Sequence, residues 1–303
     1  MMNRIAVIDL GTNTFHLLIV ERTNDVPFRQ VFRQQVYAKL GIGGVDFIIP
    51  ESFERGLVTL AAFQEAIATH GAETVQAFGT AALRTASNAP EFMEQAIQRT
   101  GIPITLISGE EEARLIYRGV SWAVPIEGDE PVLIMDIGGG SVEFIIANGS
   151  GPLWYQSFPV GVAVLYRGFH HSDPIVDAEI EAVVSFLEQQ LQPLLAALQH
   201  HPVSRLIGAA GAFDVVEGMT LPEMSAATNV EIPLERFPEV YRRIIAASLA
   251  ERLAMPGLPH PRADMIVVAF ILIDFVMRRA GIQRMTVSHY SLKEGMIREC
   301  FER

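Results

Sequence analysis

The chain has 303 residues, of which half are hydrophobic and 19% are charged, and its formal net charge is −12. This composition is typical of a folded globular protein with one large domain or two smaller ones. The acidic balance argues against a nucleic-acid binder, whose phosphate contacts need clustered Lys and Arg, and the single cysteine, Cys300, excludes an internal disulfide and a cysteine-cluster metal site.

The apolar runs of the chain are short. The first is too short for a signal peptide and is followed at once by polar residues. The longest, residues 265–277, is interrupted by Asp274 and falls below the roughly 20 residues that span a bilayer. We therefore expect a cytoplasmic protein without membrane contact, in which residues 265–277 form a buried helix.

An internal repeat organises the predicted elements. The stretch IAVIDLGTNTFHLLIV (5–20) aligns without a gap with VLIMDIGGGSVEFIIA (132–147). In each, two apolar runs flank an Asp-x-Gly turn, which predicts a β-hairpin. The copies lie much farther apart than the repeats of a solenoid, which recur about every 20 to 50 residues, so we infer two similar domains. Two unrelated hairpins are the alternative, because single glycine-containing turns are common.

Helical and strand-like segments alternate between and after the hairpins. Helices are expected near residues 51–69, 89–100, 110–120, 174–199, 234–253 and 262–279 and from about 291, and strands at 74–80, 102–108, 204–211 and 284–288. This alternation predicts an α/β fold with helix-covered sheets. Two such domains leave a cleft between their Asp-Gly turns, where a ligand would bind.

The two turns are candidate phosphate sites. Successive small residues expose backbone N–H groups that suit phosphate oxygens, which assigns this role to Gly11, Thr12, Asn13 and Thr14 and to Gly138, Gly139, Gly140 and Ser141. Asp136 and Glu143 flank the second turn and are suited to a hard divalent cation such as Mg²⁺. Glu143 aligns with His16, so the metal is expected nearer the second turn. A tight turn with two solvated acids is the simpler reading of one such motif.

The segment SGEEEARLIYRGV (108–120) predicts a helix capped by Ser108. In this helix Glu110 can pair with Arg114, and Glu111 shares a face with Arg114 and Arg118. Glu112 has apolar residues three and four positions later, so it points along the face that should be packed. A carboxylate in partly apolar surroundings has a raised pKa and acts as a general base near neutral pH. A glutamate at the edge of that face, with its head in water, is the other reading.

Arg84 and Lys39 are further candidates for phosphate binding. Arg84 follows a predicted strand and a short turn, and its guanidinium suits phosphate oxygens; either residue alone is more often a surface cation. Neither a G-x-S-x-G elbow nor a Walker-type loop occurs in the sequence. Water is therefore the expected attacker, and the protein supplies positioning and charge neutralisation.

Five motifs together resemble the exopolyphosphatase and guanosine pentaphosphate phosphohydrolase (Ppx/GppA) family, within the superfamily of acetate and sugar kinases, heat-shock proteins and actin. They read DLGTNTFHLLI, GTAALRTASN, ISGEEEARLIYRGV, DIGGGSVEF and VSHYSLKEGMI, in the order of the family. The resemblance implies two ribonuclease-H-like, actin-like domains with a cleft between them. The first would hold residues 1–120 plus about 290–303, and the second residues 121–289.

The resemblance also implies the chemistry, which is Mg²⁺-dependent release of terminal orthophosphate from inorganic polyphosphate, with guanosine pentaphosphate as the other candidate substrate. On matched positions, Glu112 is the base that activates water. The metal would lie near Asp136 and Glu143, with Asp9 as the matching acid of the first turn. The two turns, with Arg84 and Lys39, would hold phosphates.

Three departures from the family pattern bear on affinity or substrate choice. The loop GAAGAF (208–213) keeps Gly208 and Gly211 for backbone contacts to phosphate but has alanines where hydroxyl residues are usual. His289 stands where an acid is usual. Longer members carry a helical C-terminal extension, so a two-domain form is expected to grip fewer phosphates and to be less processive.

Two other functions fit the same motifs. A sugar or acetate-type kinase shares the paired turns but needs an acceptor site. A polyphosphate or nucleotide sensor would bind without turnover, and the alanine-rich loop is the best argument for it. A homodimer is expected from the prevalence of two-fold assemblies.

Overall fold

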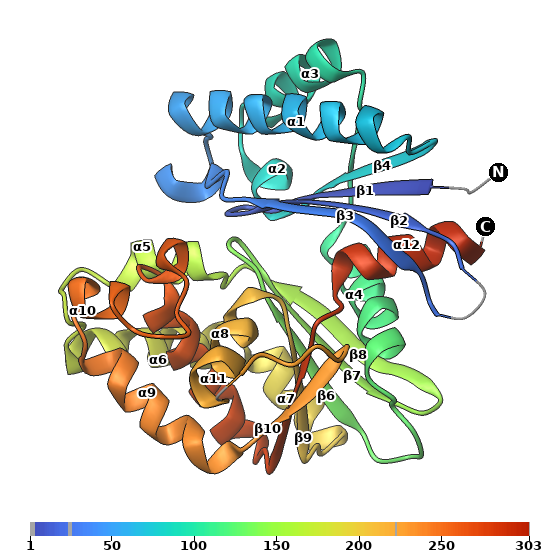
Figure 1. Ribbon diagram of the computed structural model, residues 1–303. Helices are drawn as coiled ribbons and strands as arrows, with labels where there is room; N and C mark the ends of the chain where they lie inside the picture. Colours follow the sequence, from blue (N-terminus) through green and yellow to red (C-terminus); the bar gives the residue numbers. More distant parts are fainter. Residues whose placement is uncertain (1–3, 24–25, 222, 303) are drawn as a thin grey trace.

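The computed structural model describes residues 4–23, 26–221 and 223–302, which form two helix-covered sheets, one in each lobe of Figure 1. The first sheet, in the order β3-β2-β1-β4-β5, contains β1 (Arg4–Leu10), β2 (Phe15–Glu21), β3 (Arg29–Val36), β4 (Thr74–Gly79) and β5 (Ile104–Leu106). The second, in the order β10-β11-β9-β6-β7-β8, contains β6 (Val132–Ile137), β7 (Val142–Asn148), β8 (Gly151–Phe158), β9 (Arg205–Ala209), β10 (Asn229–Ile232) and β11 (Arg284–Ser288).

The two sheets repeat one topology. In each, three antiparallel strands are followed by two strands that return in parallel beside the first. The strands β1 to β5 thus correspond to β6, β7, β8, β9 and β11, while β10 is added at one edge. Both predicted hairpins and the inferred duplication are confirmed, and the two sheets form the predicted α/β fold.

The helices cover both outer faces and fill the space between the sheets. They are α1 (Pro50–His70), α2 (Ala81–Thr85), α3 (Ala89–Thr100), α4 (Gly109–Ala123), α5 (Val162–Phe169), α6 (Asp177–Gln190), α7 (Gln192–His200), α8 (Gly211–Thr220), α9 (Phe237–Ala246), α10 (Leu249–Leu253), α11 (Ile266–Ala280) and α12 (Leu292–Glu302), with short 3₁₀ helices at Leu40–Gly43, Leu234–Arg236 and His260–Arg262. In Figure 1, α1 and α3 lie over the first sheet, and α11 lies among the helices of the second lobe. Within the described residues no helix is long and apolar enough to cross a bilayer, and α11 is the buried helix that the sequence predicts.

The two helices α4 and α12 lie side by side between the sheets. Their apolar residues share one core with strands of both lobes. Two glycines allow the helices to meet closely, because a Cβ on Gly119 would overlap the Ser291 carbonyl oxygen and one on Gly295 would overlap the Leu115 carbonyl oxygen. This packing fixes the starts of both helices against the cleft.

The start of α4 agrees with the predicted cap. The Ser108 hydroxyl accepts a hydrogen bond from the Glu111 backbone N–H at 3.1 Å. Of the two glutamates expected near Arg114, the structure pairs it with Glu111, at 2.6 Å, and not with Glu110; the Arg114 guanidinium also contacts Glu299 of α12. Arg114 therefore links the two central helices.

Candidate active site

The two glycine-containing turns have the same backbone geometry. The Gly11 N–H donates to the Thr14 carbonyl at 3.1 Å, and the Gly138 N–H donates to the Ser141 carbonyl at 3.0 Å. A Cβ would lie 2.8 Å from the carbonyl oxygen of Thr14 at Gly11 and 2.9 Å from that of Ser141 at Gly138. Only glycine fits so tight a turn at both positions, which explains why the sequence repeat keeps it.

The turns face each other across the two lobes. A Cβ on Gly139 would lie 2.9 Å from the side-chain Cγ of Asn13, and one on Gly140 would lie 2.8 Å from the Thr12 hydroxyl oxygen. The glycines of the second turn thus let the first turn approach to van der Waals distance. The cleft is consequently closed at the end where the turns meet.

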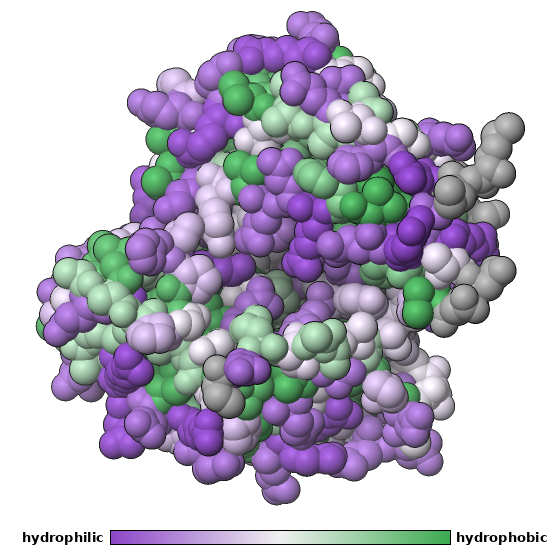
Figure 2. All heavy atoms as spheres, in the orientation of Figure 1, coloured by the Kyte–Doolittle hydropathy of each residue, from purple (hydrophilic) through white to green (hydrophobic). Residues whose placement is uncertain are grey.

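A cavity of about 180 Å³ opens from this contact, and Figure 2 shows the molecule hollowed between the two lobes, with hydrophilic side chains around the opening. All eight predicted turn residues line it. Its charged side chains are Asp9, Arg33, Lys39, Glu112, Asp136, Glu143, Asp214, Arg262, Asp264 and Lys293. The structure therefore brings together the predicted base, the predicted metal ligands and the predicted phosphate turns.

Four carboxyl groups lie together in this cavity: those of Glu112, Asp136 and Glu143 are buried, and that of Asp9 is half-buried. Burial, then repulsion from the Glu112 carboxylate, raises the pKa of Asp9 to about 8. Burial raises the pKa of Glu112 to about 7, opposed by the positive charge of Arg84, and burial raises that of Asp136 to about 6. The pKa of Glu143 is raised well above its ordinary value by burial and by repulsion from Glu112 and Asp136.

Hydrogen bonds from neighbouring residues orient three of these acids, Glu143, Asp136 and Glu112. The Ser157 hydroxyl donates to Glu143 at 2.6 Å, and the Ser291 hydroxyl, just before α12, donates to Asp136. Arg84 donates to Glu112 at 2.7 Å and to the Ile107 carbonyl at 3.0 Å. The buried position of Glu112 excludes the reading of a solvated helix glutamate.

Arg84 lies behind Glu112 and not on the cavity wall. Its guanidinium is held by Glu112 and by the strand carbonyl at the start of α4. The predicted contact of Arg84 with phosphate stays a prediction, while the geometry shows that Arg84 orients Glu112. The charge of Arg84 also keeps the Glu112 pKa from rising further.

Lys39 lies on the cavity wall and links the two lobes. Its ammonium is 3.3 Å from the Asp264 carboxylate of the other lobe. Its backbone is left-handed, with φ 49° and ψ 49°, which costs an ordinary residue about 1 to 2 kcal/mol. Such strain is common at ligand sites, and the phosphate role of Lys39 stays a prediction.

Three cations of the cavity, Arg33, Lys293 and Arg262, were not predicted from the sequence. Lys293, at the start of α12, lies 3.3 Å from Glu294, and Arg262 lies 3.8 Å from Asp214 of α8. Lys293 belongs to the motif VSHYSLKEGMI, whose position after a strand was a usable signal. Arg262 belongs to a loop without a recognisable motif, so only the tertiary structure identifies it.

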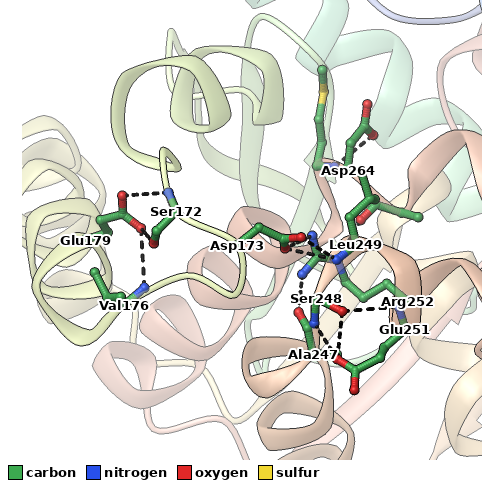
Figure 3. Close-up of polar contacts among 12 residues, drawn as sticks. Ser172, Asp173, Val176, Glu179, Ala247, Ser248, Leu249, Glu251, Arg252 and Asp264 are labelled. Carbon is green, nitrogen blue, oxygen red and sulfur yellow. Dashed lines mark hydrogen bonds and ion pairs between the residues drawn. The ribbon is translucent and has the colours of Figure 1, made fainter.

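Figure 3 shows the contacts of Arg252 beside the loop that carries Asp264. Arg262 belongs to the same loop. Arg252, which is only 1% exposed, donates from Nε to the Ala263 carbonyl at 2.8 Å and also contacts the Ala247 carbonyl. Its Nη2 is 3.2 Å from Asp173. The buried guanidinium therefore fixes the backbone beside the cavity.

The alanine-rich loop has two parts with different environments. Gly208, in β9, lies outside the cavity wall, and a Cβ there would overlap the Phe213 ring, so its glycine serves packing. Gly211 lines the cavity, as predicted, and Ala210 beside it has φ 64° and ψ 179°. That backbone conformation is nearly restricted to glycine, so Ala210 is strained. Ala210 itself lines the cavity.

His289 is tied to a buried acid. Its Nε2 is 2.7 Å from the Glu217 carboxylate, and its Nδ1 is 2.6 Å from the Ala227 carbonyl. Glu217 is fully buried and also accepts from the Ser225 N–H at 2.7 Å. His289, at a position where the resemblance leads us to expect an acid, therefore has an acid as its partner.

The donor set of the cavity fits Mg²⁺ bound together with substrate. Within residues 4–23, 26–221 and 223–302, no group of three or more His, Cys, Asp and Glu side chains is arranged to hold a metal ion by itself. Mg²⁺ usually takes only one or two carboxylates plus waters and substrate phosphates. Asp9 and Asp136, whose carboxyl groups repel each other, match that requirement.

The buried acids predict a pH dependence of stability. Because burial raises the pKa values of Asp9, Glu112 and Asp136 to about 8, 7 and 6, the folded chain holds protons that the unfolded chain has released. Their contribution to stability is complete below about pH 4 and is lost as the pH rises through these values. We expect the melting temperature of the metal-free protein to be higher at pH 5.5 than at pH 8.5.

The control for that measurement is Asp9→Asn, which removes the group with the highest of the three pKa values. The variant should lose less stability between the two pH values than the wild-type chain does. A melting temperature that rises steadily with pH in the wild type would contradict the raised pKa values.

Comparison with known proteins agrees with this geometry. A sequence model of the Ppx/GppA phosphatase family matches residues 18–303. The crystal structure of an exopolyphosphatase from Cytophaga hutchinsonii is 37% identical, with a TM-score of 0.95, over 99% of this chain and 98% of that one. The Aquifex aeolicus member of the Ppx/GppA family shares the fold, with 22% identity and a TM-score of 0.82 over 100% of this chain and 98% of that one. The chain is thus a hydrolase of phosphoanhydride bonds that belongs to the Ppx/GppA phosphatase family.

Proposed function

We propose that the protein is an exopolyphosphatase that releases terminal orthophosphate from inorganic polyphosphate, with Glu112 as the general base. The observation that carries the proposal is the position of Glu112, which is buried on the cavity wall beside both glycine-containing turns and has a pKa of about 7. A base with a pKa near the working pH is suited to take a proton from water.

Each part of the cavity has a task in this reaction. The backbone N–H groups of the two turns hold phosphate oxygens, and Lys293 neutralises charge on the substrate. Arg84 holds the Glu112 carboxylate at 2.7 Å, so that its free oxygen accepts the proton of the attacking water. Asp9 and Asp136 would hold Mg²⁺, which supplies charge neutralisation for the transferred phosphoryl group.

The size of the cavity favours a linear chain over a nucleotide. Its volume of about 180 Å³ is close to that of a cavity that holds one benzene, about 150 Å³. Pockets for ligands as large as a nucleoside usually measure about 300 to 1,000 Å³. The end of a polyphosphate fits the smaller space, and a guanosine would need the lobes to open.

Guanosine pentaphosphate is the second candidate substrate. The observation in its favour is Tyr37, an aromatic side chain on the cavity wall that is suited to stacking on a base.

The experiment compares phosphate release from long polyphosphate, tripolyphosphate and guanosine pentaphosphate, with Mg²⁺, with a chelator and without any acceptor. We expect release from polyphosphate that stops when the chelator is added. Phosphate release from guanosine pentaphosphate alone would show that this nucleotide, and not polyphosphate, is the substrate. A requirement for an acceptor would indicate a kinase. Binding of polyphosphate without phosphate release would indicate a sensor.

A further inference from the structure

A row of polar side chains crosses the first sheet beside the cavity. The strand register places Asp9 of β1 opposite His16 of β2, and His16 opposite Gln35 of the edge strand β3. All three line the cavity, as do Arg33 and Tyr37, which lie two positions before and after Gln35. Alternation along a strand puts these residues on the same face, so β3 extends the cavity wall toward the edge of the sheet.

Two atoms of this wall have unused hydrogen-bonding capacity. The His16 Nδ1 and the Gln35 Nε2 are buried, and neither has a hydrogen-bond partner among the residues that the structure describes. Buried polar groups without partners are rare in native proteins and call for a specific explanation. Two of them on neighbouring strands, facing one cavity, point to a ligand that supplies the missing partners.

The charge around the row indicates what that ligand is. Burial, and then the positive charges of Lys293, Arg33 and Arg262, hold the pKa of His16 well below its ordinary value. Three cations thus act on His16, and one of them, Lys293, also acts on Asp9 and Asp136. A ligand rich in anionic acceptor oxygens satisfies both the cations and the amide of Gln35.

Two other cations at the contact between the lobes, Lys39 and Arg167, already have partners. The Asp264 carboxylate lies 3.3 Å from the Lys39 ammonium, so the two charges neutralise each other. Arg167 of α5 contacts the Gly43 carbonyl across the lobes. An anionic chain that leaves toward β3 meets unpaired donors instead.

We propose that His16, Gln35 and Arg33 form a subsite for the internal phosphates of the substrate, so that the chain leaves the cavity along β3 while its terminal phosphate lies at Glu112. The inference rests on the proposed function and deepens it. It gives the substrate a direction, from Glu112 in the cavity to the edge of the first sheet.

The test uses Gln35→Met and Arg33→Met, singly and combined. Hydrogen bonds to charged groups are strong enough that each change should raise KM for long-chain polyphosphate about tenfold, with kcat nearly unchanged. The matched control is Gln34→Met, since Gln34 is the neighbouring glutamine and lies opposite Leu17, whose side chain packs in the core on the other face of the sheet. It should leave KM and kcat unchanged.

A second measurement separates binding from folding. Gln35→Met removes a buried donor without a partner, so the melting temperature of the free protein should stay the same or rise although KM rises. A structural role for Gln35 would lower the melting temperature instead, and that result would overturn the subsite.

The outcomes also separate this inference from the proposed function. If the wild type hydrolyses polyphosphate and the Gln35 and Arg33 variants have its KM, the subsite is wrong and the function stands. An equal effect of Gln34→Met would likewise overturn the subsite. A wild type that neither binds nor hydrolyses polyphosphate would overturn both.

Discussion

Replacing Glu112 by glutamine is expected to lower kcat for phosphate release by about a hundredfold to ten-thousandfold. The amide has the shape of the carboxylate and still accepts the hydrogen bond from Arg84, which is 2.7 Å long in the wild type. It cannot take a proton from water, so only the contribution of positioning and charge neutralisation remains. Binding of polyphosphate should persist or tighten, because one negative charge near the substrate is removed.

The measurements are the kcat for phosphate release and the equilibrium binding of polyphosphate. Glu110→Gln is the matched control, since Glu110 lies two residues earlier in α4 and is exposed. It should keep wild-type kcat. A wild-type rate in Glu112→Gln would remove Glu112 from the mechanism, whereas loss of binding together with rate would give it a role in the structure of the cavity.

Replacing Gly119 by alanine is expected to destabilise the protein by about 3 kcal/mol, at the upper end of the usual cost of overpacking. An added methyl group would overlap the Ser291 carbonyl oxygen at the contact between α4 and α12. The obstacle is backbone, so the helices must move apart, which outweighs the gain of about 1 kcal/mol in helix propensity. Because α4 carries Glu112 and α12 carries Lys293, kcat should fall as well.

Denaturant unfolding measures the change in stability. The matched control is Gly168→Ala in α5, where an added Cβ has no atom within 4 Å. This variant should be as stable as the wild type or slightly more so, because alanine favours the helix. Wild-type stability in Gly119→Ala would show that the two central helices do not need their close contact.

The elements that the sequence predicted are those with a strong apolar pattern. Both hairpins, the strands β4 and β9 and the helices α1 and α3 have their predicted places because most of their inward positions are apolar. The strands β3 and β8 were not predicted, since β3 carries many polar residues, β8 begins with Gly and Pro, and most residues of each are not buried. Edge strands owe their existence to pairing with a neighbour, which is a tertiary property.

The short helices α2, α5 and α8 were missed for a related reason. Each follows a turn beside the cavity, and all three begin without a side-chain cap. Isolated helices this short are not stable, so their sequences carry little signal. Packing against the sheets decides that they form.

The sequence by itself determined the duplicated hairpins, the turns and the identity of the acids, because these depend on local backbone geometry and on residue type. The tertiary structure alone decided three other features: that Arg84 supports Glu112 and lies off the cavity wall, that Gly208 serves packing, and that Arg262, Arg33 and Gln35 join the site. The physical reason is that pKa values, ion pairs and unused hydrogen-bonding groups depend on which distant segments are buried together, and local sequence does not encode that arrangement.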